Sequence, residues 1–253
     1  MTVIDRPEIQ EECGIFGACA QGENVAQIAF YGLFSLQHRG QESAGIAVSD
    51  GSQIRMHRDM GLVTQVFREE HIDSLPGYLA IGHTRYSTTG SSVLRNVQPM
   101  GCDCSYGPMA LAHNGDLINA AEVRSEMQAQ GVDFETTNDS EVILKLVAGS
   151  CACDIEDAVA EAMSRIRGAY AVLLMTHDRI IGFRDPHGIR PLCIGRLNGS
   201  HYVLASETCA LNTIGAQFVR EVEPGEMIII DPDGMRERQA VPTVRHARGL
   251  FEY

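Results

Sequence analysis

Short apolar segments separated by polar turns run along most of the chain, and their lengths predict a protein rich in strands. The first of them follows a polar lead of twelve residues and begins directly after Cys13. It contains Ile15 and Phe16 and predicts a short buried strand. Similar segments predict strands at 43–48, 53–58, 78–85, 169–176, 180–184, 192–197, 202–205, 218–222 and 227–230.

Apolar residues at helical spacing occupy several of the intervals between these strands. They predict helices at 25–37, 117–130, 141–146, 154–166 and 207–214. No internal repeat, low-complexity segment or linker interrupts the series. We therefore expect one domain of the α+β class, in which two layers of strands are flanked by helices.

The composition is that of a globular protein with a core of ordinary size. Of the 253 residues, 44% are hydrophobic and 21% are charged, which argues against disorder. The net charge of −13 argues against a binding surface for nucleic acid or for an anionic membrane. No apolar run reaches the roughly 18 residues that a transmembrane helix needs, and the first residues do not resemble a signal peptide. These features predict a cytoplasmic protein.

Eight cysteines are spread along the chain, and a chain of this length does not need disulfides to fold. Two pairs, Cys102 with Cys104 and Cys151 with Cys153, have a single residue between the cysteines. Zinc sites favour a spacing of about two to four residues, and no histidine stands at ligand spacing beside either pair. We therefore expect no metal site in this chain.

Cys13 is a candidate nucleophile because a thiol is the natural nucleophile at neutral pH, provided that a base accepts its proton. If residues 1–12 are removed, the new α-amino group of Cys13, with a reference pKa of about 7.7–8.0, is available as that base. The alternative is that Cys13 is only a small buried apolar residue, as many free cysteines are.

Three further segments place polar residues where apolar segments end. Arg85 ends a predicted strand and is followed by hydroxyl residues and glycine, which suits an anion-binding turn or simply a solvated strand end. Asn114 and Gly115 favour either a hairpin or a strand–loop–helix junction, and the helical period after Leu117 favours the junction. Asp139 precedes a predicted helix and is either a binding residue or its N-cap.

Five segments of the chain, taken in order, resemble the class II glutamine amidotransferases. They are Cys13–Gly17, Leu36–Gly45, Gly82–Thr88, Ala112–Leu117 and Asn138–Glu141. This resemblance implies an N-terminal-nucleophile hydrolase with a four-layer αββα sandwich of two mostly antiparallel sheets. Within the class, four segments resemble the amidophosphoribosyltransferase family most, namely 37–41, 184–192, 205–208 and 222–226.

The resemblance implies a propeptide at 1–12, a glutaminase domain at 13–253, and a phosphoribosyltransferase domain that this chain lacks. It implies that Cys13 is the nucleophile and forms a γ-glutamyl thioester with glutamine. The side-chain amide of Asn114 and the backbone N–H of Gly115 are expected to form the oxyanion hole. In the complete enzyme, the released ammonia would convert phosphoribosylpyrophosphate to 5-phosphoribosylamine in the first committed step of purine synthesis.

The resemblance also implies how glutamine is recognised. Arg85 is expected to bind the α-carboxylate and Asp139 the α-ammonium. The remaining positions that match the substrate site of the family are Tyr86, Thr88, Arg39 and Gly40.

No cofactor is expected in this chain, although full-length members of the family use Mg²⁺ and some carry a 4Fe–4S cluster. The expected partners are L-glutamine, the phosphoribosyltransferase domain and further copies of the protein in a homo-oligomer, with no nucleic acid and no membrane. Two alternatives stay open, a free-standing glutaminase or other amidohydrolase and a non-catalytic glutamine-binding module.

Overall fold

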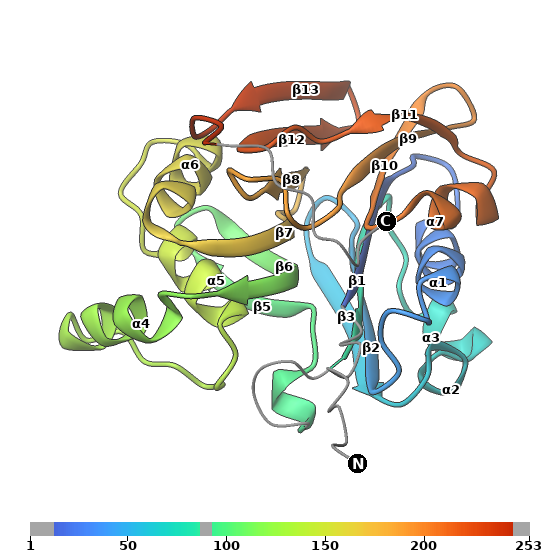
Figure 1. Cartoon of the computed structure of the whole chain (residues 1–253). Coiled ribbons are helices and arrows are strands. Elements are labelled where there is room, and N and C mark those ends of the chain that lie inside the picture. Colours follow the sequence, from blue (N-terminus) through green and yellow to red (C-terminus); the bar gives the residue numbers. More distant parts are fainter. Residues whose placement is uncertain (1–12, 87–92, 245–253) are drawn as a thin grey trace, which may run out of the picture.

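Two antiparallel sheets lie face to face between two layers of helices, as Figure 1 shows. The structure is a computed structural model that describes residues 13–86 and 93–244. The expected αββα sandwich is therefore confirmed. In the described part of the chain, no helix combines the length and the apolar character needed to cross a bilayer.

The seven-stranded sheet carries the first strand of the chain near its centre. Its strand order is β11-β9-β10-β1-β4-β2-β3. The bounds are β1 Gly14–Cys19, β2 Ser43–Ser49, β3 Ile54–Met60, β4 Leu79–Arg85, β9 Cys193–Leu197, β10 His201–Ala205 and β11 Gln217–Glu221. Because β1 and β4 are antiparallel neighbours and Gly14 pairs with Thr84, the start of β1 lies beside the end of β4.

The six-stranded sheet has the order β13-β12-β8-β7-β6-β5. Its bounds are β5 Met100–Cys104, β6 Gly107–Leu117, β7 Gly168–Met175, β8 Ile180–Arg184, β12 Glu226–Asp231 and β13 Gly234–Gln239. The longest strand is β6, which pairs with β7 along 110–117 but with β5 only along 107–111. Among the described residues, one edge of β6 is therefore without a neighbouring strand beyond Leu111.

Helices cover the outer face of each sheet (Figure 1). On the six-stranded sheet these are α4 Ala120–Ala129, α5 Ser140–Ala148 and α6 Ile155–Arg165. On the seven-stranded sheet they are α1 Val25–Ser35, α2 Val63–Val66, α3 Glu69–Asp73 and α7 Thr208–Thr213, and a short 3₁₀ helix, η1, spans Leu94–Asn96.

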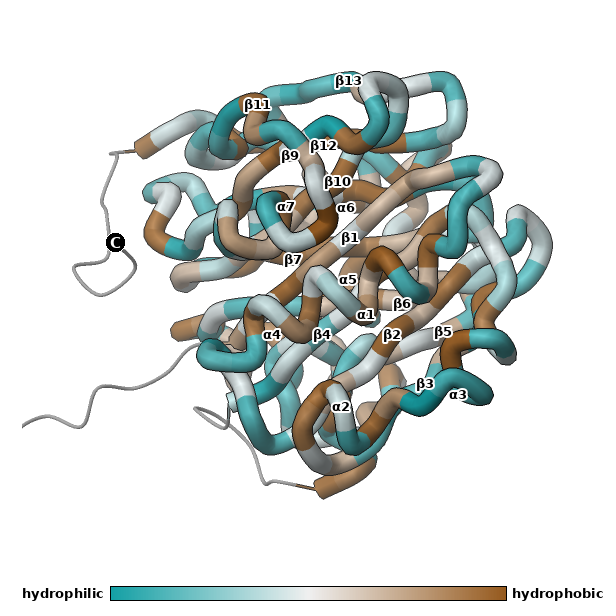
Figure 2. Tube along the Cα trace, turned by 90° about the vertical axis from the view of Figure 1, so that its right-hand side faces the viewer, coloured by the Kyte–Doolittle hydropathy of each residue, from teal (hydrophilic) through white to brown (hydrophobic). Residues whose placement is uncertain are grey.

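Apolar side chains on the two faces of each sheet form three apolar cores, one between the sheets and one under each helical layer. Successive side chains of a strand point to opposite faces. Ile15 accordingly belongs to the core between the sheets, whereas its neighbour Phe16 packs under α1 with Leu33. Figure 2 shows apolar positions, in brown, concentrated on the strands of the interior and hydrophilic positions, in teal, on the outer turns.

The predicted strand–loop–helix junction after Met109 is wrong in one respect. Strand β6 continues through Asn114 and Gly115 to Leu117, and helix α4 begins only at Ala120. Gly115 has a φ of 138°, a conformation that side chains disfavour but glycine adopts readily. The Asn-Gly pair therefore produces an irregularity inside a strand and not a turn.

Candidate active site

Cys13 lies half-buried at the start of β1, where that strand meets the end of β4. Its Sγ donates a hydrogen bond to the carbonyl of Tyr86 at 3.4 Å. Its own carbonyl accepts a hydrogen bond from Nε of Arg39 at 3.0 Å. Contacts from two separate segments thus fix the backbone and the thiol of the predicted nucleophile.

A partly buried ion pair holds Arg39 in this position. Nη1 of Arg39 lies 2.6 Å from Oε1 of Glu207, and Nε2 of His38 lies 3.1 Å from the same oxygen. Burial would raise the pKa of Glu207, but Arg39 and His38 outweigh it, so that the pKa lies below its ordinary value. Next to Glu207, the hydroxyl of Ser206 accepts a hydrogen bond from the N–H of Ile15 at 2.9 Å. The turn before α7 therefore supports the start of β1 at two points.

Gly40 allows the segment that carries Arg39 to lie against the end of β4. A Cβ at Gly40 would lie 2.6 Å from the carbonyl carbon and 2.7 Å from the backbone nitrogen of Arg85. Those atoms belong to the backbone and cannot move aside like a flexible side chain. No other residue fits at this position without displacing β4.

Arg85 ends β4 and is only 2% exposed, which rules out the solvated strand end. It lines a small polar cavity together with Cys13, Gly115 and Asp139. The other described residues that line the cavity are Tyr86, Gln98, His113, Asp116 and Asn138. The cavity volume is about 20 Å³, less than a glutamine molecule requires, so the lining must move apart for such a ligand to enter. Thr88 lies outside the described residues.

Asn114 is fully buried on β6, next to Gly115 of the cavity. Neither the oxygen nor the nitrogen of its side-chain amide has a hydrogen-bond partner among the described residues. Leaving such a buried polar group unpaired costs about 1–3 kcal/mol, and most proteins avoid that cost. Asn114 is not itself among the residues that line the cavity, but an unpaired buried amide next to a lining residue is typical of a donor that serves a ligand.

The backbone N–H of Gly115 is directed away from β7, the strand that pairs with this part of β6. Tyr170 stands opposite Gly115 on β7, but both of its backbone groups bond to Asp185. In an antiparallel ladder this makes Gly115 and Tyr170 a non-hydrogen-bonded pair, whose N–H groups point away from each other. The N–H of Gly115 therefore points to the edge of β6 that has no neighbouring strand. A Cβ here would lie 2.0 Å from the carbonyl oxygen of Ala169, so only glycine fits.

Asp139 is the first residue before α5, but its carboxylate makes no side-chain capping hydrogen bond to that helix. The carboxylate is 7% exposed, accepts the N–H of Leu117 at 2.9 Å and lies 3.6 Å from Nδ1 of His113. Burial acts to raise the pKa of Asp139, but His113 and the N–H of Leu117 outweigh it and keep that pKa below its ordinary value. The N-cap alternative therefore does not account for the side chain, which stays ionised inside the site.

The sequence reasoning missed a polar network behind the cavity. Nδ1 of His113 lies 3.1 Å from Oγ of Ser140, and the N–H of His113 donates to Oε1 of Gln98 at 2.7 Å. Nε2 of Gln98 donates in turn to Oγ of Ser140 at 3.0 Å. A histidine inside an apolar strand was a visible signal for His113, whereas nothing in the sequence around Gln98 predicted that the loop brings it here.

His83 is buried on β4 behind Arg85, and its Nε2 lies 3.1 Å from the carbonyl of His113. Because a carbonyl only accepts, Nε2 carries the proton, and Nδ1 is buried without a partner among the described residues. Burial, with a smaller contribution from Arg85, lowers the pKa of His83 to about 3. This histidine is therefore neutral at physiological pH.

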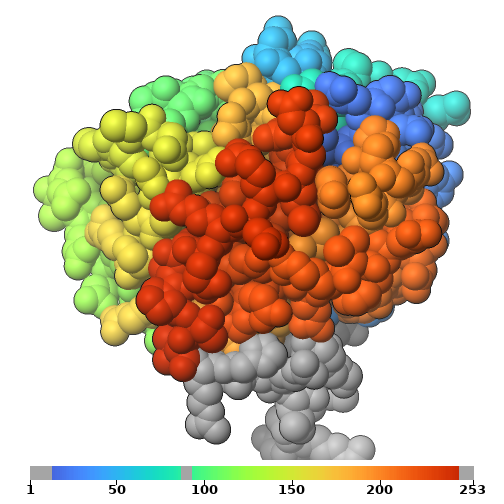
Figure 3. Space-filling view, turned by 90° about the horizontal axis from the view of Figure 1, so that it is seen from above, coloured from blue at the N-terminus to red at the C-terminus, as the bar shows by residue number. Residues whose placement is uncertain are grey.

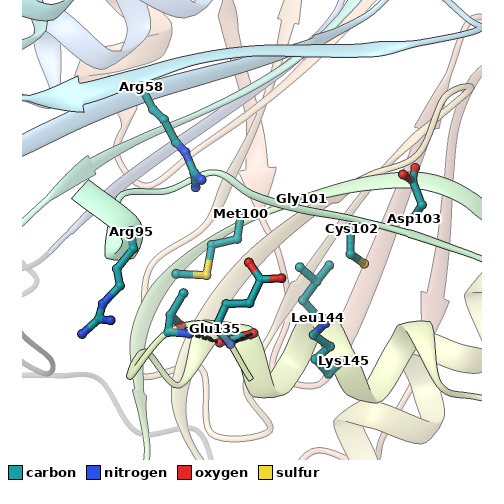
Figure 4. Close-up of a pocket in the computed structure, with 11 residues that line it drawn as sticks. Arg58, Arg95, Met100, Gly101, Cys102, Asp103, Glu135, Leu144 and Lys145 are labelled. Atoms are coloured by element: carbon teal, nitrogen blue, oxygen red, sulfur yellow. Dashed lines mark hydrogen bonds between the residues drawn. The ribbon is translucent and has the colours of Figure 1, made fainter. Parts of the chain in front are cut away.

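A second polar cavity, of about 350 Å³, lies between β3, β5 and the start of α5. Figure 4 shows Arg58 of β3 and Glu135 pointing into it from opposite sides. Arg58 donates to the carbonyl of Val97 at 2.6 Å, and Glu141 accepts the N–H groups of Glu135 and Thr136, each at 2.8 Å. These charged groups hold the two loops that lead to Gln98 and Asp139. The cavity is also lined by Cys102, and burial raises the pKa of that thiol to about 11, which disfavours the thiolate.

One group of metal-ligating side chains gathers in the described part of the chain. Its members are His38, Glu207 and Cys209, with ligand atoms within 4.8 Å of one another. Cysteine thiolates hold a 4Fe–4S cluster, and this group offers a single cysteine. It therefore does not fit such a cluster, and its carboxylate already bonds to Arg39.

Comparison with known proteins identifies the class of protein to which this fold and this site belong. Residues 83–213, just over half of the chain, match the family described as a glutamine amidotransferase domain. The chain belongs to this family.

The relatives of the chain indicate which kind of glutamine amidotransferase it resembles most. The amidophosphoribosyltransferase of Synechococcus elongatus is 50% identical over 236 residues, which cover 91% of this chain and 48% of the relative. A solved glutamine phosphoribosylpyrophosphate amidotransferase from B. subtilis, complexed with ADP and GMP, has a TM-score of 0.88 and 42% identity and covers 93% of this chain and 51% of its own. Another, described as the allosteric regulatory enzyme of purine biosynthesis, has a TM-score of 0.89 and 43% identity over 93% of this chain and 50% of its own.

The chain thus spans about half the length of the curated relatives and solved structures that it matches. The predicted resemblance to the glutamine amidotransferase domain of amidophosphoribosyltransferases is confirmed.

Proposed function

We propose that the chain hydrolyses the side-chain amide of L-glutamine to glutamate and ammonia, with Cys13 as the nucleophile. The observation that carries this proposal is the single cavity that Cys13 shares with Arg85, Gly115 and Asp139. A nucleophile, a cation, an anion and an outward-directed N–H meet there. Glutamine presents a carbonyl, a carboxylate and an ammonium group, and each finds a complement in this set.

The chemistry begins with removal of residues 1–12, which frees the α-amino group of Cys13. That amine takes the thiol proton while Sγ attacks the side-chain carbonyl carbon of glutamine. The oxyanion accepts hydrogen bonds from the amide of Asn114 and the N–H of Gly115, and one such donor contributes about 3–4 kcal/mol. When the intermediate collapses, ammonia leaves with the proton from the α-ammonium group. Water then attacks the γ-glutamyl thioester and releases glutamate.

Two buried charged residues recognise glutamine, namely Arg85 at the end of β4 and Asp139 at the start of α5. The planar guanidinium of Arg85 suits bidentate binding of the α-carboxylate. Asp139, held ionised by its surroundings, pairs with the α-ammonium. Tyr86, which lines the cavity, and Thr88, which lies outside the described residues, match positions of the substrate site of the family. Arg39 positions the nucleophile through its contact with the carbonyl of Cys13.

We further propose that this domain supplies ammonia to a phosphoribosyltransferase half of the kind found in its longer relatives. There the ammonia would displace pyrophosphate from phosphoribosylpyrophosphate and give 5-phosphoribosylamine, the first committed step of purine synthesis. The proposal is supported by relatives named amidophosphoribosyltransferase and by the solved neighbour described as an enzyme of purine biosynthesis. Any Mg²⁺ requirement would belong to that second half, and a homo-oligomer is expected.

The test is hydrolysis by the purified chain, followed as release of ammonia and glutamate and combined with intact-mass spectrometry. We expect L-glutamine to be cleaved by material that begins at Cys13, and Cys13→Ser to be inactive. L-Asparagine, which is one methylene shorter, and 4-carbamoylbutanoate, which lacks the α-ammonium, should be poor substrates. Binding of glutamine without hydrolysis would favour a non-catalytic module, and equal cleavage of unrelated amides would favour a general amidohydrolase.

A further inference from the structure

Three metal-binding side chains meet at the surface where α1 and α7 pack together. The ligand atoms of His38, Glu207 and Cys209 lie within 4.8 Å of one another. His38 follows the end of α1, Glu207 directly precedes α7 and Cys209 lies in its first turn. Figure 1 shows the two helices side by side, and in Figure 3 the first described segments, in blue, lie against segments near residue 200, in orange. The fold therefore joins ligands that are 169 residues apart in the chain.

The separations of these ligand atoms fit a tetrahedral zinc ion. Nε2 of His38 lies 3.2 Å from Oε2 of Glu207, and Sγ of Cys209 lies 3.5 Å from the same oxygen. Zn²⁺ holds nitrogen and oxygen at about 2.0–2.2 Å and sulfur at about 2.3 Å, so a tetrahedron places its ligand atoms about 3.4–3.6 Å apart. Two of the three separations therefore need a change of no more than about 0.2 Å to bind the ion.

The chemistry of the three groups selects the metal. Imidazole, carboxylate and thiolate are the ligands that Zn²⁺ takes in proteins, and three of them leave a fourth position for water. Mg²⁺ and Ca²⁺ prefer sites made of oxygen atoms, which these groups do not provide. The side chain of His38 is 56% exposed and that of Glu207 is 30% exposed, so an ion can reach the group without opening the fold.

Hydrogen bonds already define the position that the ion would occupy. The carboxylate of Glu207 only accepts, so Nε2 of His38 carries the proton between them, and Sγ of Cys209 donates to the same oxygen. Zn²⁺ would replace both protons, of which the first moves to Nδ1 of His38 and the second passes to the solvent. No electron is transferred, and the three side chains keep the directions in which they now point.

The same carboxylate supports the nucleophile. Oε1 of Glu207 lies 2.6 Å from Nη1 of Arg39, whose Nε donates to the carbonyl of Cys13 at 3.0 Å. A doubly charged ion on Oε2 shares the negative charge of Glu207 and repels the guanidinium beside it. Filling the zinc position would therefore weaken the ion pair that holds Arg39 against the start of β1.

We propose that His38, Glu207 and Cys209 form a Zn²⁺ site, and that zinc bound there slows glutamine hydrolysis by loosening Arg39. Binding of the ion is independent of the proposed function, whereas its effect on the rate rests on it. The spacing of the cysteines did not predict this site, because its single thiol is completed by two side chains that the sequence does not place beside it.

The binding experiment uses the chain with Cys13→Ser, so that the thiol of the nucleophile cannot hold the metal. Zn²⁺ binding is measured by calorimetry, and Co²⁺ serves as the optical probe. We expect one ion per chain, with the charge-transfer absorption of a Co²⁺–thiolate bond that excess Mg²⁺ does not remove. Cys209→Ser should abolish this absorption, and Cys209→Ser and His38→Gln should each weaken binding at least about tenfold.

The matched control removes two other thiols. Cys151 and Cys153 are exposed, and replacing both by serine on the same background should leave the affinity and the absorption unchanged. His38 is exposed, so His38→Gln keeps the test valid even if Cys209→Ser fails to fold. Melting temperatures without metal identify any variant that does not fold.

Inhibition of glutamine hydrolysis provides the second readout, on chains that retain Cys13. The thiol and the amine of Cys13 can themselves bind zinc, so the comparison is between wild type and Cys209→Ser. We expect Cys209→Ser to need at least about tenfold more Zn²⁺ for half-inhibition, and a chelator to restore the rate of wild type. If the chain does not hydrolyse glutamine at all, the binding titrations still decide whether the site exists.

Two sets of results would overturn the inference. The site is refuted if Co²⁺ gives no thiolate absorption, or if Cys209→Ser and His38→Gln bind Zn²⁺ as tightly as their parent. The effect on the nucleophile is refuted if wild type and Cys209→Ser are inhibited at the same Zn²⁺ concentration, since the inhibitory ion would then sit elsewhere.

Discussion

Replacing Asp139 by asparagine separates recognition of glutamine from support of the fold. Oδ1 of an asparagine can still accept the N–H of Leu117, which Asp139 now accepts at 2.9 Å. Asparagine is also about as good as aspartate at a helix N-terminus. The change therefore removes one negative charge and leaves the local hydrogen bonding largely intact.

The expected magnitude follows from burial. Asp139 is 7% exposed and Arg85 is 2% exposed, so a substrate held between them is largely out of water. Removing one partner of a buried, hydrogen-bonded charge pair costs about 2–5 kcal/mol. This corresponds to a decrease of roughly 30- to 5,000-fold in kcat/KM for L-glutamine. The melting temperature should change little.

The decisive assay compares two substrates. 4-Carbamoylbutanoate retains the amide and the carboxylate of glutamine but lacks the ammonium group. Wild type should prefer L-glutamine over this analogue strongly, and Asp139→Asn should lose most of that preference. Asp116→Asn is the matched control, because Asp116 lines the same cavity but is 41% exposed at its side chain and faces Arg190. An equal loss on both substrates, or a loss only in Asp116→Asn, would refute the assignment of Asp139.

Three further predictions concern other groups of the site. Asn114→Ala should lower kcat roughly 10²- to 10³-fold with little change in KM, and a pure KM effect in steady-state kinetics would move Asn114 into substrate recognition. Active material should begin at Cys13 by intact mass, and full activity from a chain that still begins at Met1 would exclude the α-amine as base. His83 stays neutral in the folded state down to a pKa of about 3. The unfolded chain binds that proton below about pH 6.5, so stability is lost as the pH falls from 6.5, by about 1.4 kcal/mol per unit from this group. His83→Gln should flatten this slope in urea titrations, and an unchanged slope would contradict the burial of a neutral histidine.

Most strands and helices were predictable because their apolar residues repeat at the period of the element they form. Strand β1 and helices α1 and α6 follow the predicted segments closely. Strands β5 and β13, at the two edges of their sheet, were missed. Strand β13 carries mostly charged and polar residues, whereas β5 is only five residues long and alternates methionine and cysteine with glycine and aspartate. Charged edge strands protect a sheet from pairing with other chains, and in β13 that requirement removes the apolar alternation that sequence reasoning depends on.

The sequence motifs predicted which residues form the site, but they did not predict how the fold brings those residues together. Cys13, Arg85 and Asp139 were assigned by their motifs, and the structure places all three around one cavity. Gly115 was predicted in the loop of a strand–loop–helix junction, because the residues from Leu117 onward repeat at a helical period. Only the pairing of β6 with β7 reveals that the strand continues and that its glycine exposes an N–H at the sheet edge.

Strand β6 carries both candidate oxyanion donors, Asn114 and Gly115. The side-chain amide of Asn114 has no hydrogen-bond partner within the described ranges, and the N–H of Gly115 points away from β7 because Tyr170 opposite bonds to Asp185 instead. An oxyanion donor must be fixed before the reaction, and a rigid strand in the centre of two packed layers achieves this better than a loop.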